Sequence, residues 1–247
     1  SVDVFMYYIE DAGGQSATGH VTIFTELPRP ADNPASVEPG ASTNYYALDS
    51  LSSLPNFDLL EPIGQEIVPQ VNFQSTGGNF AGSGLADDVG AVFEGYIDIP
   101  ESNTYVLYVN SDDGSKLYIG GELLIDNDGL HAMHEEAGQI ALAPGLHEIR
   151  VEFFERGGGA GCIVSLSSDT LLKQVIPESM WWHHVVVHGD INSDGSVNVL
   201  DLLELIANWG SCDIPPPDGG DSDCEADLNE DGQVNVEDLL VLIAQWS

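Results

Sequence analysis

A duplicated segment close to the C-terminal end constrains this sequence more than any other feature. Residues 190–209 read DINSDGSVNVLDLLELIANW, and residues 227–246 read DLNEDGQVNVEDLLVLIAQW. The two copies are offset by 37 positions, and 14 of their 20 aligned residues are identical. An internal repeat of this kind indicates that one short structural unit occurs twice. Each copy starts with acidic and amide residues and continues as an apolar stretch with helical spacing.

Each copy places oxygen-bearing side chains at the spacing of a calcium-binding loop. Counted from the first Asp, positions 1, 3, 5, 9 and 12 are Asp or Asn, and position 6 is Gly. A hard cation with several oxygen ligands needs a chain that wraps around it, and Gly permits the tight bend. The sequence therefore predicts two calcium ions, one in each loop. With the position that offers a backbone carbonyl included, the predicted ligands are Asp190, Asn192, Asp194, Ser196, Asn198, Asp201, Asp227, Asn229, Asp231, Gln233, Asn235 and Asp238.

An exiting helix follows each loop, but no helical pattern precedes either one. The predicted apolar stripe is Leu202, Leu203, Leu205, Ile206 and Trp209, matched by Leu239, Leu240, Leu242, Ile243 and Trp246. Val197 and Val234, at position 8, are expected to join the two loops through a short β-bridge and the apolar contact beside it. Two such half EF-hands, over residues 189–247, resemble a type I dockerin, the calcium-dependent module that binds cohesin domains.

The resemblance implies a docking partner, but two positions depart from the usual pattern. Cellulosomal dockerins usually carry small hydroxylated residues at loop positions 10 and 11, where this sequence has Val199-Leu200 and Val236-Glu237. The expected partner is therefore a cohesin-like or immunoglobulin-like protein domain, either separate or within the parent protein. The duplication implies two related docking faces.

The three cysteines separate into a predicted pair and a single residue. Cys212 and Cys224 flank a segment rich in Pro, Gly and Asp, which favours a disulfide that closes a short ring. Cys162 lies in an apolar run and is predicted to be a buried thiol. The predicted disulfide indicates an oxidising compartment.

The charge balance excludes several functions. Five Lys and Arg residues oppose 41 Asp and Glu residues, which gives a formal net charge of −36. Because no basic stripe is present, nucleic-acid binding through phosphate neutralisation is excluded, and docking on anionic lipid is disfavoured. No stretch approaches the roughly 20 apolar residues of a membrane span, so membrane insertion is not expected. An acidic surface suits divalent cations and a calcium-rich exterior, and we predict a secreted or cell-surface protein.

The N-terminal region predicts a hairpin followed by a linker. Residues 2–9 and 20–25 are rich in β-branched and aromatic types, and a turn segment lies between them. This segment, assigned to residues 1–27, resembles the last hairpin of bacterial cadherin-like or immunoglobulin-like repeats. We interpret the chain as a piece of a longer protein. Residues 28–42 contain four prolines and predict a semi-rigid linker.

Residues 43–187 read as short strands separated by Gly, Asn and Asp turns. The spacing favours an antiparallel β-sandwich. Examples of the runs are Val92–Ile99, Tyr105–Val109, Lys116–Ile119, Ile149–Phe154 and Ile163–Leu166. From about residue 188 the pattern changes to acidic loops and Leu-rich helical windows. The predicted fold class is mainly β: an antiparallel β-sandwich with a small C-terminal α module of two half EF-hands over residues 188–247.

Several stretches of this region resemble the β-sandwich module named after anthrax protective antigen. The stretches that carry the resemblance are Tyr45-Tyr46, Leu54-Pro55, Phe93–Pro100, Ser111–Gly121, Leu124–His131 and Leu142–His147. Such modules accompany glycosidases, adhesins and toxins, and several are lectins. In the lectins an Asp-Asp pair holds a calcium that chelates sugar hydroxyls, and Asp112-Asp113 match that pair. The alternative is that the two residues only shape a turn. The lectin site also draws ligands from a late loop, here residues 155–161, which offers no Asp, Asn or Gln beyond Glu155, so a cation there would be under-coordinated.

No catalytic constellation stands out. The sequence has no nucleophile elbow, phosphate loop or HExxH spacing. His183, His184 and His188, beside two tryptophans, are interpreted as a strand that leads into the C-terminal module. We therefore expect a non-catalytic, calcium-binding adhesion or assembly region, with carbohydrate as a candidate ligand of the sandwich. Two alternatives are the accessory region of a secreted glycosidase or protease, and an extracellular polymer subunit that self-associates by strand addition.

Overall fold

The computed structural model describes residues 2–24, 27–185, 187–192, 194–212, 224–229 and 231–246. The chain divides into two compact units, of which one contains residues 1–33 and 39–182 and the other residues 34–38 and 183–247. Strands form 45% of the structure and helices 11%, and the sheets are antiparallel. This confirms the predicted fold class, a β-sandwich with a small helical module.

The larger sheet of the sandwich has eight strands in the order β10-β9-β12-β7-β15-β3, and β4 pairs with both β7 and β5. These strands are β3 (Val37–Pro39), β4 (Ala41–Ala47), β5 (Gly64–Val68), β7 (Val89–Ile99), β9 (Ser115–Ile119), β10 (Glu122–Asn127), β12 (Gly145–Glu155) and β15 (Trp181–His184). The central pair, β7 and β12, runs antiparallel from Gly145 opposite Ile99 to Glu155 opposite Val89.

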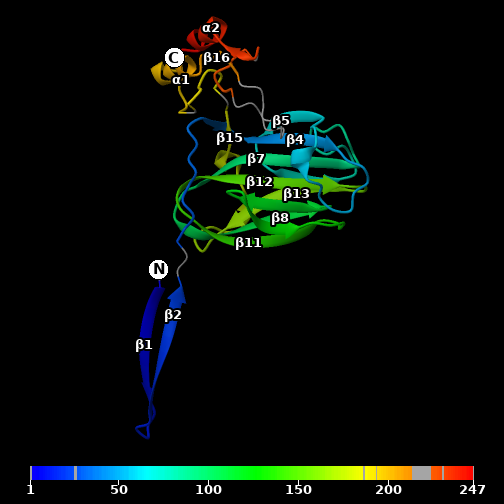
Figure 1. The fold of residues 1–247 in the computed structure, drawn as a ribbon. Helices are drawn as coiled ribbons and strands as arrows, with labels where there is room; N and C mark the ends of the chain where they lie inside the picture. The colour runs from blue at the N-terminus through cyan, green and yellow to red at the C-terminus, as the bar shows by residue number, and fades with distance from the viewer. Residues whose placement is uncertain are drawn as a thin grey trace. The chain divides into compact units, whose positions relative to one another are not determined.

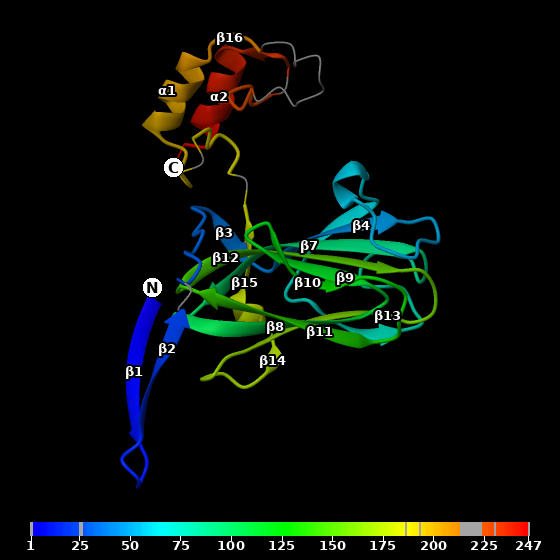
Figure 2. The same cartoon turned by 60° about the horizontal axis from the view of Figure 1, so that its bottom comes forward.

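The smaller sheet has five strands in the order β11-β8-β13-β14, and β6 also pairs with β13. Its strands are β6 (Asn72–Thr76), β8 (Asn103–Asp112), β11 (His134–Leu142), β13 (Ala160–Ser167) and β14 (Gln174–Val175). The two sheets lie face to face (Figures 1 and 2). A short 3₁₀ helix, η2 (Glu178–Met180), precedes β15.

The core fills the space between the two sheets because alternate residues of each strand point inward. Along β8, for example, Tyr105, Leu107 and Val109 are buried and alternate with partly exposed residues. Aromatic rings pack at one end, where the Phe80 and Phe153 centroids are 4.4 Å apart. Cys162 is fully buried in this core, as its apolar surroundings in the sequence predict, and burial raises the pKa of its thiol to about 12.

Within residues 28–42, for which the sequence predicts a linker, the structure contains β3 and the start of β4. The Arg29 N–H donates to the Ala141 carbonyl at 2.8 Å, and the Ala143 N–H donates to the Arg29 carbonyl at 3.0 Å. The Arg29 guanidinium also pairs with Asp32 at 2.7 Å and lies 3.1 Å from Nδ1 of the buried His147. Proline removes its own N–H donor only, so the residues between the prolines still hydrogen-bond to the sandwich.

A satellite cluster lies on the outer face of the larger sheet. It contains Tyr46, Phe57 and Val92, and the rings of Tyr46 and Phe57 have centroids 4.9 Å apart. Phe57 begins the 3₁₀ helix η1 (Phe57–Leu59), which Asn56 caps by accepting from the Asp58 N–H at 3.1 Å. The cluster holds the segment between β4 and β5 against the sheet.

The N-terminal hairpin consists of β1 (Val2–Glu10) and β2 (Ser16–Phe24). The strands pair from Val2 opposite Phe24 to Glu10 opposite Ser16. In the turn, Asp11 Oδ1 accepts from the Gly13 and Gln15 N–H groups at 2.8 and 2.9 Å. The predicted hairpin is therefore present, and its likeness to cadherin-like or immunoglobulin-like repeats stays a prediction.

The C-terminal unit contains two equivalent helices, α1 (Val199–Ala207) and α2 (Val236–Ala244), and two short strands, β16 (Gly210–Ser211) and β17 (Gln233–Val234). Its small core is formed by Ile191, Val197, Leu205, Ala226, Val234 and Leu242. No helix among the described residues is both long and apolar enough to cross a membrane.

The predicted β-bridge between Val197 and Val234 is wrong, although both side chains enter the same core. Val234 pairs with Gly210 instead. The reason is that a disulfide joins Cys212 to Cys224, with Cα atoms 5.8 Å apart. It holds the chain that leaves α1 beside the second loop, where the Cys212 N–H donates to the Gly232 carbonyl at 3.0 Å.

Candidate calcium sites and docking surface

The start of α1 ties the two ends of the first acidic loop together. Asn198 is the N-cap, and its side chain accepts from the Leu200 N–H at 2.9 Å. Asp201, at the third helical position, is 0% exposed. Its two carboxylate oxygens accept from the Asn198 N–H at 2.7 Å and the Asn192 N–H at 3.2 Å. Loop position 12 therefore serves both as half of a capping box and as an inward-facing carboxylate.

In the first half of that loop, the carboxylates accept from backbone N–H groups of the turn. Asp190 accepts from the N–H groups of Asp194 at 3.0 Å and Gly195 at 2.8 Å. Gly195 has φ +90°, a conformation that other residues adopt only with strain. Asp194 accepts from the Ser196 N–H at 3.0 Å. Each N–H bond occupies part of one carboxylate's acceptor capacity, and the remaining lone pairs are available to a cation.

The second loop repeats this pattern. Asp227 accepts from the N–H groups of Asp231 at 3.1 Å and Gly232 at 2.7 Å. Asp238 is 0% exposed and accepts from the N–H groups of Asn235 at 2.7 Å and Asn229 at 3.1 Å. The side chains predicted as ligands thus form the same hydrogen-bond pattern with the backbone in both loops. They offer only oxygen ligands, the donor set that calcium prefers.

Three acidic side chains of the sandwich also converge. Asp112, Asp113 and Glu155 each place one carboxylate oxygen within 4.8 Å of the others, and the peptide bond between Asp112 and Asp113 is cis. Asp113 accepts from the N–H groups of His131 at 2.9 Å and Arg156 at 3.1 Å. Asp112 accepts from the Ser75 hydroxyl at 2.8 Å.

Glu155 is the member of this group that the chain leaves unsatisfied. Its side chain is 1% exposed, and neither carboxylate oxygen has a hydrogen-bond partner in the described part of the chain. Burial, followed by the charge of Asp113, raises the pKa of Glu155 to about 7. A buried, unpaired carboxylate beside two others is costly unless it takes up a proton or a cation joins the group. The geometry therefore fits a cation held by three carboxylates.

The inward position of Glu155 was present in the sequence as a period of two. Val151 and Phe153, two and four positions earlier on β12, are fully buried. Because strand residues two apart point to the same face, Glu155 must follow them into the interior. The sequence prediction assigned Glu155 to a loop, whereas the strand β12 extends to this residue.

The residues of each predicted apolar stripe divide between two sides of the helix, one buried and one exposed. Leu205 and Leu242 are fully buried, whereas Leu203 is 58% and Leu240 is 63% exposed. The outward residues are Val199, Leu200, Leu203, Ile206 and Trp209 from the first repeat, and Val236, Leu240, Ile243 and Trp246 from the second. We call these nine residues the outward apolar face. A helix packed on one side needs an apolar stripe on that side only, so the second face calls for another explanation.

Comparison with known families identifies both units. The PA14 domain model matches residues 38–179, which is more than half of the chain. The chain therefore belongs to the PA14 domain family. The model of the type I dockerin domain matches residues 188–245. Both are binding and assembly modules, and type I dockerin domains bind calcium.

Among curated proteins, the chain is similar to the anti-sigma-I factor RsgI3 of Acetivibrio thermocellus. The two are 29% identical over 116 residues, which is 47% of this chain and 17% of that protein. A solved anti-sigma factor domain-containing protein is 27% identical with a TM-score of 0.52, and the match covers 58% of this chain and 48% of that one. The chain thus spans less than half the length of either relative.

Two solved PA14 domains share the fold. The PA14 domain of the MpAFP antifreeze protein is 18% identical with a TM-score of 0.53, over 62% of this chain and 94% of that one. The PA14 sugar-binding domain of an RTX adhesin is also 18% identical, with a TM-score of 0.51, over 59% of this chain and 98% of that one.

We predict that Glu155→Gln raises the unfolding midpoint of the sandwich without calcium but reduces the further rise that calcium causes. In chelator at pH 8, loss of the buried charge should raise the unfolding midpoint of the sandwich by several degrees, as expected for about 1–3 kcal/mol. In calcium, the variant should show a smaller calcium-induced rise than the wild type, because one ligand is weakened. Scanning calorimetry measures both midpoints.

Glu122→Gln, at an exposed position that opens β10, is the matched control and should leave both midpoints unchanged. A Glu155→Gln variant that is less stable in chelator, yet keeps the full calcium-induced rise, would contradict the assignment.

Proposed function

We propose that this chain is the non-catalytic adhesion and assembly region of a secreted or cell-surface modular protein. Calcium folds the dockerin unit, the outward apolar face docks on a cohesin-type domain, and the sandwich binds carbohydrate. The observation that carries the proposal is the outward apolar face, which both helices of a dockerin-family module present in equivalent positions.

Two calcium ions are proposed for the dockerin unit, one per loop. The carboxylates of each loop repel one another, and no Lys or Arg follows Lys173 in the sequence to neutralise them. A cation from solution therefore supplies the attraction that closes each loop, and its binding contributes directly to folding.

Each loop should lose its ion independently. Asp201→Ala and Asp238→Ala each remove a ligand and half of a capping box, so each should reduce by one the number of calcium ions bound in isothermal titration. Asp49→Ala, an exposed acidic position of the sandwich, should leave that number unchanged. If both loop variants bind as many ions as the wild type, the assignment of position 12 is wrong.

The outward apolar face defines the partner chemistry. Leu203, Ile206 and Trp209 are spaced so that they cover one side of α1 and its C-terminal end, and the second repeat offers the matching residues. The charged residues of these helices, such as Glu204 and Glu237, are acidic. The face therefore fits an apolar surface with a neutral or basic rim, rather than one that recognises small hydroxylated dockerin residues.

Docking should tolerate one damaged repeat but not two. If the related faces permit binding in two orientations, Leu203→Asp or Leu240→Asp alone should weaken binding to a cohesin domain only a few-fold. The double variant should weaken it at least about 100-fold, or about 2.7 kcal/mol. Surface plasmon resonance against a panel of recombinant cohesin domains measures this.

Circular dichroism in calcium provides the folding control, because the double variant must keep the helical signal of the wild type. Single variants that abolish binding would contradict docking in two orientations. A double variant that binds like the wild type would show that the outward apolar face is not the docking surface.

A calcium-dependent carbohydrate site is proposed at Asp112, Asp113 and Glu155. The support is their convergence and the unsatisfied oxygens of Glu155, together with the shared fold of the sugar-binding domain of the RTX adhesin. A calcium held by three carboxylates on a strand end keeps coordination positions that two sugar hydroxyls can fill.

A glycan array run with and without calcium tests this site. Binding that requires calcium and is lost in Asp112→Ala supports it. Calcium-dependent binding that persists in Asp112→Ala would place the sugar elsewhere.

Self-association is a second candidate, favoured by the hairpin. Among the described residues, β1 and β2 pair only with each other, and a two-stranded sheet has two edges with unpaired backbone groups. Strand addition to a second chain would cover one of them. Light scattering in calcium that shows only monomers at high protein concentration would rule it out.

A further inference from the structure

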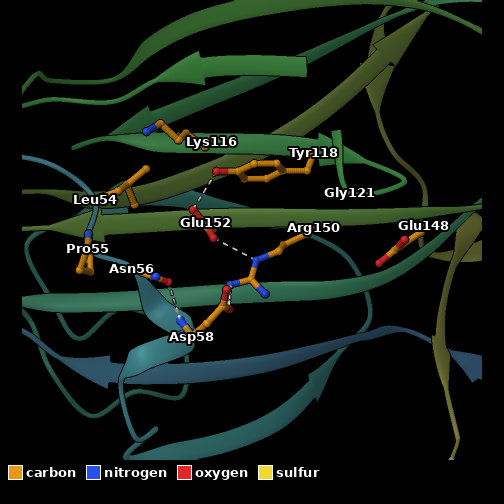
Figure 3. A pocket seen from close by; sticks show the side chains of 10 residues that line it. All are labelled: Leu54, Pro55, Asn56, Asp58, Lys116, Tyr118, Gly121, Glu148, Arg150 and Glu152. Carbon is orange, nitrogen blue, oxygen red and sulfur yellow. Dashed lines mark hydrogen bonds and ion pairs between the residues drawn. The ribbon is translucent and has the colours of Figure 1, made fainter. Parts of the chain in front are cut away.

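A cleft of about 420 Å³ opens on the outer face of the larger sheet, and none of the three converging carboxylates lines it (Figure 3). Its floor comes from β9 and β12, where Lys116 lies opposite Glu152 and Tyr118 lies opposite Arg150. Because these side chains stand on two adjacent strands of one sheet, the backbone fixes their spacing.

One wall of the cleft is preformed. Leu54, Pro55 and Asn56 belong to the segment that the satellite cluster around Phe57 anchors to the sheet. The Leu54 N–H donates to Asp128 Oδ1 at 2.8 Å, which fixes the other end of this wall. A wall anchored at both ends needs little rearrangement to receive a ligand.

The polar groups of the floor are held in one network. The Arg150 guanidinium donates to Glu152 at 3.0 Å, Glu94 at 2.6 Å and Asp58 at 2.8 Å. The Tyr118 hydroxyl donates to the second oxygen of Glu152 at 3.2 Å. Burial, followed by the charge of Glu152, raises the pKa of Tyr118 to about 12, so its hydroxyl stays protonated. Arg150 keeps further N–H donors for a ligand.

The charges of the cleft argue against an ionic ligand of either sign. An anion would face Glu148, Glu152 and Asp58 on the lining. A cation would have to approach the Arg150 guanidinium, which already pairs with the carboxylates of Asp58, Glu94 and Glu152. It would also have to approach Lys116, whose Nζ lies 3.5 and 3.8 Å from two Asp carboxylates. A neutral ligand rich in hydroxyl groups meets neither penalty.

We propose that this cleft is a second carbohydrate site, independent of calcium, that takes one or two rings of a neutral saccharide. Arg150 offers donors beside the acceptors of Glu152, an arrangement that suits vicinal hydroxyls. The Tyr118 ring, Leu54 and Pro55 offer apolar surface to the C–H faces of a sugar ring. The volume lies within the range of small-molecule sites.

The test separates this cleft from the Asp112 site by using the full chain with Asp112→Asn in calcium buffer. Neutral disaccharides (lactose, cellobiose, maltose, mannobiose and xylobiose) are added singly at millimolar concentration. Backbone amide shifts are followed by NMR. At least one disaccharide should shift amides within 54–58, 116–121 and 148–152. Adding Tyr118→Ala should weaken its binding at least about tenfold, or about 1.4 kcal/mol.

Tyr108→Ala is the matched control, because Tyr108 is a partly buried tyrosine on β8 of the other sheet and should leave the affinity unchanged. Lys116→Gln, a milder change, should also weaken binding and serves if Tyr118→Ala does not fold. The proposal is overturned if no neutral disaccharide binds the Asp112→Asn chain. It is also overturned if putrescine alone shifts these amides, or if Tyr118→Ala and Lys116→Gln bind like their parent.

Discussion

Repulsion between buried carboxylates is the constraint on which this molecule depends. Asp201, Asp238 and Glu155 are all excluded from solvent, and Glu155 lies next to Asp112 and Asp113. In the loops, backbone N–H groups satisfy part of each carboxylate, whereas Glu155 has no such partner in the described part of the chain. Buried like charges are relieved either by protonation, which the raised pKa of Glu155 favours, or by an opposite charge. A cation from outside the chain would relieve the cluster at Glu155, and type I dockerin domains, the family of the C-terminal unit, bind calcium.

Four of the five Lys and Arg side chains pair with acidic residues elsewhere, and the fifth, Arg156, is exposed. Arg29 pairs with Asp32, and Lys173 pairs with Glu135. Arg150 pairs with three carboxylates on the outer face of the larger sheet, where Lys116 also faces two. In the outer cleft, Arg150 and Lys116 thus offset part of the acidic charge, whereas no ion pair to a Lys or Arg is present at Asp112, Asp113 or Glu155 among the described residues. The same scarcity of basic residues thus explains why one proposed sugar site needs calcium and the other does not.

The two units bury their surfaces differently, and this difference fits their proposed roles. The sandwich encloses a large core between its sheets, and its candidate sites lie at strand ends and on an outer face. The dockerin unit encloses a small core of six residues, to which each helix contributes one fully buried leucine. Its outward apolar face remains available to a partner, and burial of that face would add the apolar contact that a small core lacks.

Much of this could be predicted from the sequence where the signal was local. Short strand runs and turn residues predicted the sandwich, and the apolar residues around Cys162 in the sequence predicted that its thiol is buried. The predicted bridge between the loops was wrong because Val234 pairs with Gly210 instead. The disulfide between Cys212 and Cys224 holds the segment of Gly210 beside the second loop. The docking of Arg29 on the β11–β12 edge was hidden by the prolines around it.

The sequence by itself determined the dockerin loops, because every proposed ligand of a loop lies within twelve consecutive residues whose spacing dictates which side chains turn inward. Only the tertiary structure decided that Glu155 meets Asp112 and Asp113, that each helix keeps an apolar side facing outward, and that β9, β12 and the segment around Phe57 enclose a cleft. These groupings join residues that lie far apart in the chain, so strand register and packing, rather than local spacing, bring them together.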